Sequence, residues 1–299
     1  LHLCDRRQRQ MCIRDRFSAI AIGSGHVPPG NTVIENIQGA QATADDSMAV
    51  GASALANREG ATALGKLSKA TNNNAVAVGP DSVASGSWAT ATGASANASG
   101  QASAAFGESA TASGKKSIAT GSHASASGEN AIASGKNAKA LANDTIAIGA
   151  DANATANAAG SLAIGRGSVV NATDATVVGP AAQANGANAT AVGRGAAANG
   201  TESAALGRGA TATGNQSVAL GQGAQATVDS GVALGNGAVA NRAARDRNTI
   251  VINTADPSKT AGLSDNNNGG DANTVYAPVR LVDAPGAVSY THLRAHETT

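Results

Sequence analysis

The chain has 299 residues, of which 71 are Ala and 37 are Gly, while aromatic residues make up 2% and charged residues 14%. Large apolar side chains are too few to build the compact interior of an ordinary enzyme of this length. The charged fraction is also too low for typical intrinsic disorder, and a repeat protein is the class that fits.

The two ends of the chain differ in composition from the rest. Codons for residues 288–293 can be chosen so that their reverse complement encodes residues 11–15, and the ends resemble inverted copies of a translated sequencing adapter. We therefore interpret residues 1–16 and 288–299 as adapter-derived and exclude them from the reasoning on fold. Without them both Cys are lost, and 15 Lys and Arg stand against 17 Asp and Glu, so the net charge changes from +1 to −2. This balance predicts no nucleic-acid partner.

Residues 17–46 form an irregular start, and a 14-residue repeat follows over residues 47–240. A glycine recurs at this period with a single two-residue insertion after Gly149, and we call these residues the frame glycines. Ala stands two residues before each frame glycine except at Val177, and five residues after each except at Val170. We predict that the frame glycines form turns. They are Gly51, Gly65, Gly79, Gly93, Gly107, Gly121, Gly135, Gly149, Gly165, Gly179, Gly193, Gly207, Gly221 and Gly235.

Each repeat predicts two short strands. Glycine in every unit and small residues at alternate sites oppose a helix, although 14 residues would also make two heptads. One predicted strand ends at the frame glycine, and the other covers about two to five residues after it. The sequence therefore predicts an all-β fold, a parallel β-roll or solenoid of fourteen 14-residue coils.

The outer faces of the two strands differ. In the first strand the sites one and three residues before the frame glycine are mostly Val, Ile or Leu, whereas the second strand is mostly polar outside. A continuous apolar stripe of this kind is larger than a monomer tolerates, so we predict a homo-oligomer, with cover by a cap or flanking domain as the alternative. The stripe weakens in the middle, at Thr90, Thr92, Thr120 and Ser134. The predicted interface residues are Val50, Leu64, Val78, Phe106, Ile148, Ile164, Val178, Val192, Leu206, Leu220 and Leu234.

Three repeats carry a family resemblance. The segments Asn-Ala-Val-Ala-Val-Gly at 74–79, Asn-Ala-Thr-Ala-Val-Gly at 188–193 and Gln-Ser-Val-Ala-Leu-Gly at 216–221 resemble the head repeat of YadA-like trimeric autotransporter adhesins. The resemblance implies a left-handed roll and a homotrimer on the outer membrane of a Gram-negative bacterium. It also implies non-enzymatic attachment to host matrix proteins, cells or surface glycans. The ligand-binding residues that it suggests are Asn74, Val76, Val78, Asn188, Thr190 and Val192.

The chain also departs from that family. Residues 241–287 form a non-repeat segment with two strand-like runs, and nothing in them resembles the neck, coiled-coil stalk or membrane barrel of such adhesins. We expect contact with a membrane only through a C-terminal anchor that is missing from this sequence. The alternative function is that of a structural spacer, such as part of a phage tail fibre, which holds another binding domain.

The sequence predicts no catalytic site. Outside the two ends the only histidines are His26 and His123, which stand alone, so neither a catalytic triad nor a histidine-rich metal site can be assembled. We therefore expect no enzyme activity, no metal and no cofactor. The sole tryptophan, Trp88, stands at the entry to a turn, where packing against the turn is the favoured interpretation and an exposed binding aromatic is the alternative.

Overall fold

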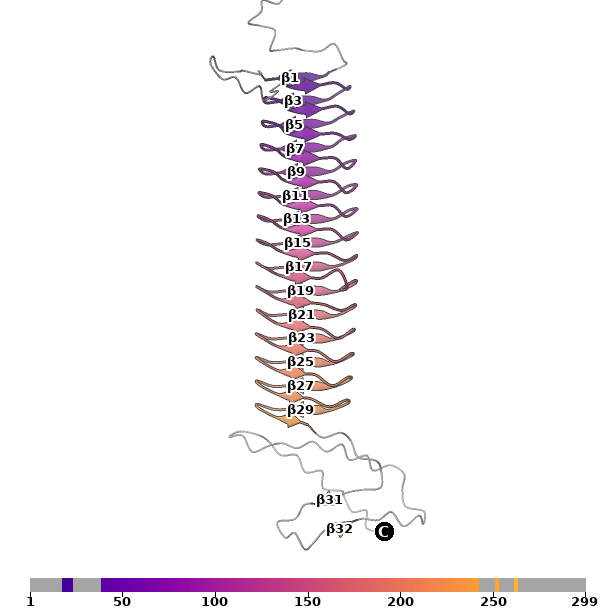
Figure 1. The fold of residues 1–299 in the computed structure, drawn as a ribbon, viewed down its shortest axis with the longest axis vertical. Coiled ribbons are helices and arrows are strands. Elements are labelled where there is room, and N and C mark those ends of the chain that lie inside the picture. Colours follow the sequence, from indigo (N-terminus) through magenta and orange to yellow (C-terminus); the bar gives the residue numbers. More distant parts are fainter. Residues whose placement is uncertain (1–17, 24–38, 242–250, 253–260, 263–299) are drawn as a thin grey trace, which may run out of the picture. The chain divides into compact units, whose positions relative to one another are not determined.

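The computed structural model describes residues 18–23, 39–241, 251–252 and 261–262, and these residues contain no helix. The chain divides into two compact units, Leu1–Ala182 and Gln183–Thr299. In each unit the described repeat is a parallel β-solenoid, in which a coil contributes one three-residue strand with an odd number and one two-residue strand with an even number (Figure 1). The prediction of an all-β parallel solenoid is therefore confirmed.

In the first unit, the odd-numbered strands form one parallel sheet and the even-numbered strands form another. The odd-numbered strands are β1 (Ile20–Ile22), β3 (Met48–Val50), β5 (Thr62–Leu64), β7 (Val76–Val78), β9 (Thr90–Thr92), β11 (Ala104–Phe106), β13 (Ile118–Thr120), β15 (Ile132–Ser134), β17 (Ile146–Ile148), β19 (Leu162–Ile164) and β21 (Thr176–Val178). The even-numbered strands are β2 (Gln41–Ala42), β4 (Leu55–Ala56), β6 (Lys69–Ala70), β8 (Val83–Ala84), β10 (Asn97–Ala98), β12 (Thr111–Ala112), β14 (Ser125–Ala126), β16 (Lys139–Ala140), β18 (Asn153–Ala154) and β20 (Val169–Val170).

The second unit repeats this arrangement with fewer coils. Its odd-numbered strands are β23 (Thr190–Val192), β25 (Ala204–Leu206), β27 (Val218–Leu220) and β29 (Val232–Leu234). Its even-numbered strands are β22 (Gln183–Ala184), β24 (Ala197–Ala198), β26 (Thr211–Ala212), β28 (Gln225–Ala226) and β30 (Val239–Ala240). Beyond the repeat, β31 (Val251–Ile252) and β32 (Ala261–Gly262) pair antiparallel.

Strand pairing places equivalent repeat positions side by side. Ala49 of β3 pairs with Ala63 of β5, 14 residues later, and the same offset recurs along each sheet. Two strands of the predicted irregular start also belong to the roll, because β1 pairs directly with β3 and β2 pairs with β4. The two-residue insertion falls in the turn between β18 and β19, and Ile146 pairs with Leu162 across it, so the register of the sheet is kept.

The core is one layer of small side chains between the two sheets. In the coil of Gly93 these side chains are Ala89, Ala91, Ala96 and Ala98, all fully buried. Where Ser or Thr replaces Ala, the hydroxyl in most coils donates to a carbonyl three residues earlier, as Ser103 Oγ does to Gly100 O at 2.7 Å, whereas Ser203 Oγ has no such bond. The largest fully buried side chains of the described residues are Val170 and Val177, in the two coils that follow the insertion. An interior this narrow accepts little else, because close-packed cores resist added volume.

The frame glycines are required by the backbone. Gly121 has φ +124°, in a region that L-residues rarely adopt, and a Cβ placed there would lie 2.6 Å from the carbonyl oxygen of Gly135 in the next coil. The same close approach recurs between Gly93 and Gly107. The predicted turn role of these glycines therefore has two physical causes, the dihedral angle and the contact between stacked turns.

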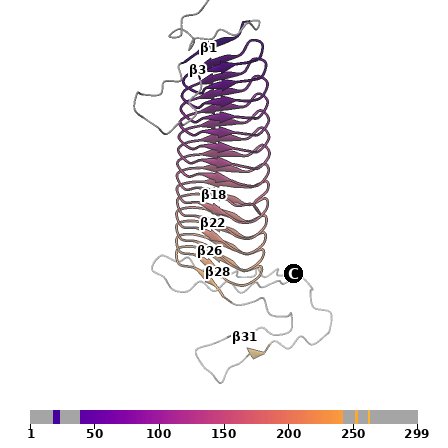
Figure 2. The same ribbon diagram turned by 45° about the horizontal axis from the view of Figure 1, so that its top comes forward.

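Two turns reverse the chain in every coil, and Figure 2 shows them at opposite sides of the strands. We call residues seven to five before a frame glycine the entry turn, and the frame glycine with the next two residues the glycine turn. Each turn ends in a left-handed residue, such as Asn130 (φ 55°) in an entry turn and His123 (φ 58°) in a glycine turn. The second strand is therefore shorter than predicted, because the residue two after the frame glycine completes the turn and the strand begins only four residues after it.

Candidate functional site

The outer face of the odd-numbered strands is apolar in both units. In the first unit Val50, Leu64 and Val78 stand opposite one another on β3, β5 and β7, and in the second unit Leu206 and Leu220 do so on β25 and β27. We call this surface the apolar face. The opposite side of the same strands carries the buried alanines, so each of these strands is largely apolar on both sides.

All eleven predicted interface residues lie on the apolar face of their unit. Thr92, Thr120 and Ser134 interrupt their column in the first unit, as the sequence predicts. The even-numbered strands differ, because their single outward residue is often polar and exposed, as at Lys69 and Lys139. The exposed interface residues are Leu64, Phe106, Ile148, Leu220 and Leu234, and the half-buried ones are Val50, Val78, Ile164, Val178, Val192 and Leu206.

The structure separates the predicted ligand-binding residues into two groups. Asn74 and Asn188 are exposed left-handed residues of entry turns. Val76 and Val78 lie on the apolar face of β7, and Thr190 and Val192 lie on that of β23. Since Val78 and Val192 also belong to the predicted subunit interface, one contact would exclude the other at these two positions.

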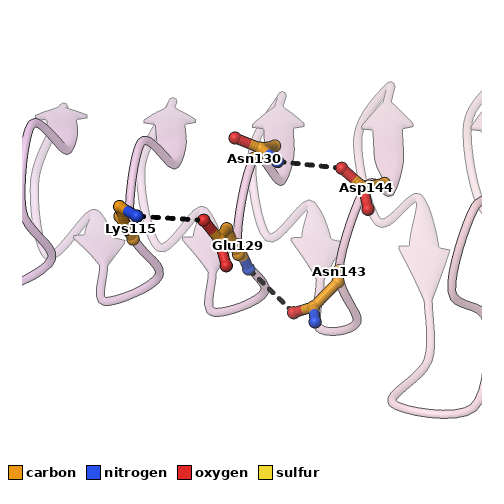
Figure 3. Close-up of polar contacts among 5 residues, drawn as sticks. All are labelled: Lys115, Glu129, Asn130, Asn143 and Asp144. Carbon is orange, nitrogen blue, oxygen red and sulfur yellow. Dashed lines mark hydrogen bonds and ion pairs between the residues drawn. The ribbon is translucent and has the colours of Figure 1, made fainter.

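Several entry turns are cross-linked from coil to coil (Figure 3). Lys115 Nζ lies 3.5 Å from Glu129 Oε1, and Asn130 Nδ2 donates to Asp144 Oδ1 at 2.9 Å. The backbone N–H of Glu129 donates to Asn143 Oδ1 at 2.9 Å. Polar groups of neighbouring entry turns therefore bond to one another along the stack. In the second unit Gln216 Nε2 likewise donates to Glu202 Oε2 at 3.0 Å.

Three successive entry turns of the first unit, residues 72–74, 86–88 and 100–102, contain no charged residue. We call them the neutral entry turns. Trp88 lies in the middle one, is 59% exposed and has φ 56°. Its exposure contradicts the favoured interpretation that it packs against the turn. The sequence contained the signal, because Trp88 occupies the repeat position of Asn74, and Asn is a residue type that favours left-handed turn conformations.

The described residues contain no cluster of side chains that could hold a metal ion. No group of three or more His, Cys, Asp or Glu side chains gathers among them. His26 lies outside the described residues, and the His123 ring lies 2.8 Å from the hydroxyl of Ser122, measured from Nδ1 to Oγ. The described part of the chain also contains no helix that is long and apolar enough to cross a membrane.

Comparison with protein families assigns the repeat. The family model of the YadA head domain repeat, which contains two copies of the repeat, matches more than half of the chain and falls on both units. Among curated proteins, none matches the chain. The matched residues are 38–54, 42–68, 56–82, 98–124, 126–152, 171–196, 198–224 and 212–238.

Proposed function

The chain belongs to the YadA head repeat family, an adhesin family, and from this premise we propose that it is the head region of a homotrimeric adhesin on the surface of a Gram-negative bacterium. The head would form a left-handed roll in each of three chains. It would attach the cell to host matrix proteins, other cells or surface glycans without any enzymatic reaction. Many weak, repeated contacts along three chains would add up to firm attachment.

The apolar face is the observation that carries the proposal. Its side chains recur at every coil or nearly so, and several remain more than 40% exposed, among them Leu64, Leu220 and Leu234. A row of apolar side chains with the same spacing as the coils is matched best by an identical row on another copy of the chain. Burial of this face between copies removes it from water and leaves both edges of the roll, with their turns, for ligands.

This arrangement divides the two groups of predicted residues by role. Val76, Val78, Thr190 and Val192 would lie at or near the subunit contact, while Asn74 and Asn188 would stay accessible at the edge of each roll. We therefore assign the asparagines, and not the residues on the strands, to ligand contact.

The mass in solution tests the oligomer directly. We expect the full chain to sediment as a trimer and Ile148→Asp to dissociate it, because a carboxylate would be buried in an apolar contact. Lys139→Asp is the matched control, since Lys139 is an exposed strand residue of the other sheet. A folded, β-rich monomer of the unmodified chain would contradict the proposal.

Attachment is the second test. Beads coated with the full chain should bind surfaces of collagen, laminin or host cells, and the dissociated Ile148→Asp protein should bind at least tenfold less at equal mass because it loses multivalency. A trimer that binds none of these surfaces would favour a structural spacer that holds another domain.

A further inference from the structure

We propose that the neutral entry turns form a binding site for an uncharged saccharide, with Trp88 as the platform on which a sugar ring stacks. The proposal rests on the adhesin function above and names a ligand class for one place on the head. It goes beyond the residues suggested by the family resemblance, none of which is aromatic.

Trp88 combines exposure with backbone strain. It is the most exposed large apolar residue in the described part of the chain, at 59%, and its φ of 56° is unusual for a bulky residue. Eight of the fourteen equivalent positions hold Gly, Asn or Asp, which tolerate this conformation better, and Trp88 is the only aromatic residue among the others. An exposed ring gains little burial to offset the strain, so packing within the chain does not explain the residue. Strained residues that persist without a structural benefit point to function.

The turn that carries Trp88 is braced from the preceding coil. Asn72 Nδ2 donates to Ser85 O at 3.1 Å, and Ser87 Oγ donates to Asn72 Oδ1 at 2.9 Å. The backbone N–H of Trp88 donates to Asn73 O at 2.9 Å. Ser85, Ser87 and the backbone of Trp88 are therefore held by the preceding coil before any ligand arrives, which lowers the entropic cost of binding.

The surroundings of Trp88 supply neutral hydrogen-bonding groups. Asn73, Asn74 and Gln101 are exposed, and within the described part of the chain no hydrogen bond occupies their side chains. The next residue at the position of Trp88 is Ala102, whose side chain is a single methyl group. Stacked coils are about 4.8 Å apart, so the three turns present these groups over about 10 Å.

These groups fit the two sides of a sugar. A pyranose has an apolar C–H face that stacks on an aromatic ring, and hydroxyl groups around its rim that bond to amides. The absence of Lys and Arg from all three turns disfavours sulfated or carboxylated glycans, and the absence of Asp and Glu disfavours a cationic ligand. Thr90 and Thr92 follow Trp88 on β9, so the adjoining strand is also uncharged.

The sole tryptophan makes the test direct, because its fluorescence reports on this site alone. The full chain would be titrated with chitotriose, maltotriose and cellotriose, and with heparin fragments as the charged comparison. We expect at least one neutral trisaccharide to change the emission of Trp88 and to bind immobilised protein. Heparin should have at least tenfold lower affinity.

Trp88→Asn is the decisive variant, because Asn suits the left-handed turn and should keep the fold intact. It should lose at least tenfold in affinity for the neutral saccharide, whereas Trp88→Tyr should retain part of it. Lys116→Ala, at the equivalent position two coils later, is the matched control and should bind normally. Circular dichroism and mass in solution would accompany each variant.

Three results would overturn the proposal. The first is that no neutral saccharide binds, and the second is that Trp88→Asn binds as well as the unmodified chain. The third is that Trp88→Asn dissociates the oligomer, because Trp88 would then contact a second copy. If Trp88→Asn loses the saccharide but still attaches to collagen or cells, both proposals stand. If the unmodified chain binds no neutral saccharide but still attaches to collagen or cells, only the saccharide site is refuted.

Discussion

Two stretches of entry turns in the first unit share one backbone and differ in what their side chains do. At residues 114–144 the polar groups bind one another from coil to coil, as in the pairs Lys115 with Glu129 and Asn130 with Asp144. At residues 72–102 the only such bridge comes from Asn72, and Trp88 stands exposed beside it. The comparison teaches that the coil fixes where a turn residue lies, while its neighbours 14 residues away decide whether it remains available to a ligand.

Substitution of a frame glycine should lower the free energy of unfolding more than any other change, and by the same amount in the two stretches. Gly93→Ala and Gly121→Ala each place a Cβ against the backbone of the next coil at a φ that only glycine adopts readily. We expect each to cost at least about 3 kcal/mol, measured by urea unfolding followed by circular dichroism. Gly167→Ala is the control, because a Cβ there has no atom within 4 Å, and it should cost only about 1 kcal/mol. Unequal losses at Gly93 and Gly121 would show that the two stretches differ in their backbones.

Enlargement of a core side chain should have the second-largest effect on stability. Ala91→Leu and Ala133→Leu add three carbons to fully buried sites in the two stretches. Each should destabilise the protein by about 3 kcal/mol through overpacking, seen as a lower melting temperature. Ala94→Leu, at an exposed turn position near Ala91, should change the melting temperature little. An unchanged melting temperature in either variant would mean that the single layer of alanines is not closely packed at that site.

Exchanging the residue types at Trp88 and Asn130, which are both left-handed, should change the free energy of unfolding in opposite directions. Trp88→Asn should raise the free energy of unfolding by about 1 kcal/mol, because Asn tolerates positive φ. Asn130→Trp should lower it by about 1 kcal/mol or more, since it introduces the strain and removes the bond to Asp144. Thermal unfolding of both variants checks this, and a loss of stability in Trp88→Asn would mean that the indole packs usefully in the fold.

Removal of a cross-link between turns should have the smallest effect. Lys115→Ala should cost about 0.5 kcal/mol at low salt and nearly nothing in concentrated NaCl, because its partner Glu129 is also largely exposed. Gln101→Ala, at the same position one coil earlier, has no such partner and should be neutral at all salt concentrations. A salt-independent loss at Lys115 would indicate that its aliphatic stem, rather than its charge, contributes.

Most of the architecture could be predicted from the sequence, because its signals are periodic. The frame glycines and the alanines two residues before them determine the coil, and the apolar sites beside Ala77 predict the outer face of β7. The second strand was predicted too long, because polar residues such as Asp81 and His123 suit both a solvent-facing strand and a left-handed turn. The exposure of Trp88 was missed although the repeat position signalled it, because Trp88 stands where Asn74 stands one coil earlier, and Asn favours left-handed turns at the surface. The subunit contact and the assigned ligand residues stay predictions.

The turn between β18 and β19 absorbs two extra residues while both sheets keep their pairing. Ala158 anchors that turn in the core, and Asn157 beside it is exposed. The length of this turn can therefore change without changing the register of the strands. An epitope or a protease site inserted after Asn157 would be displayed to antibodies or enzymes without displacing any strand.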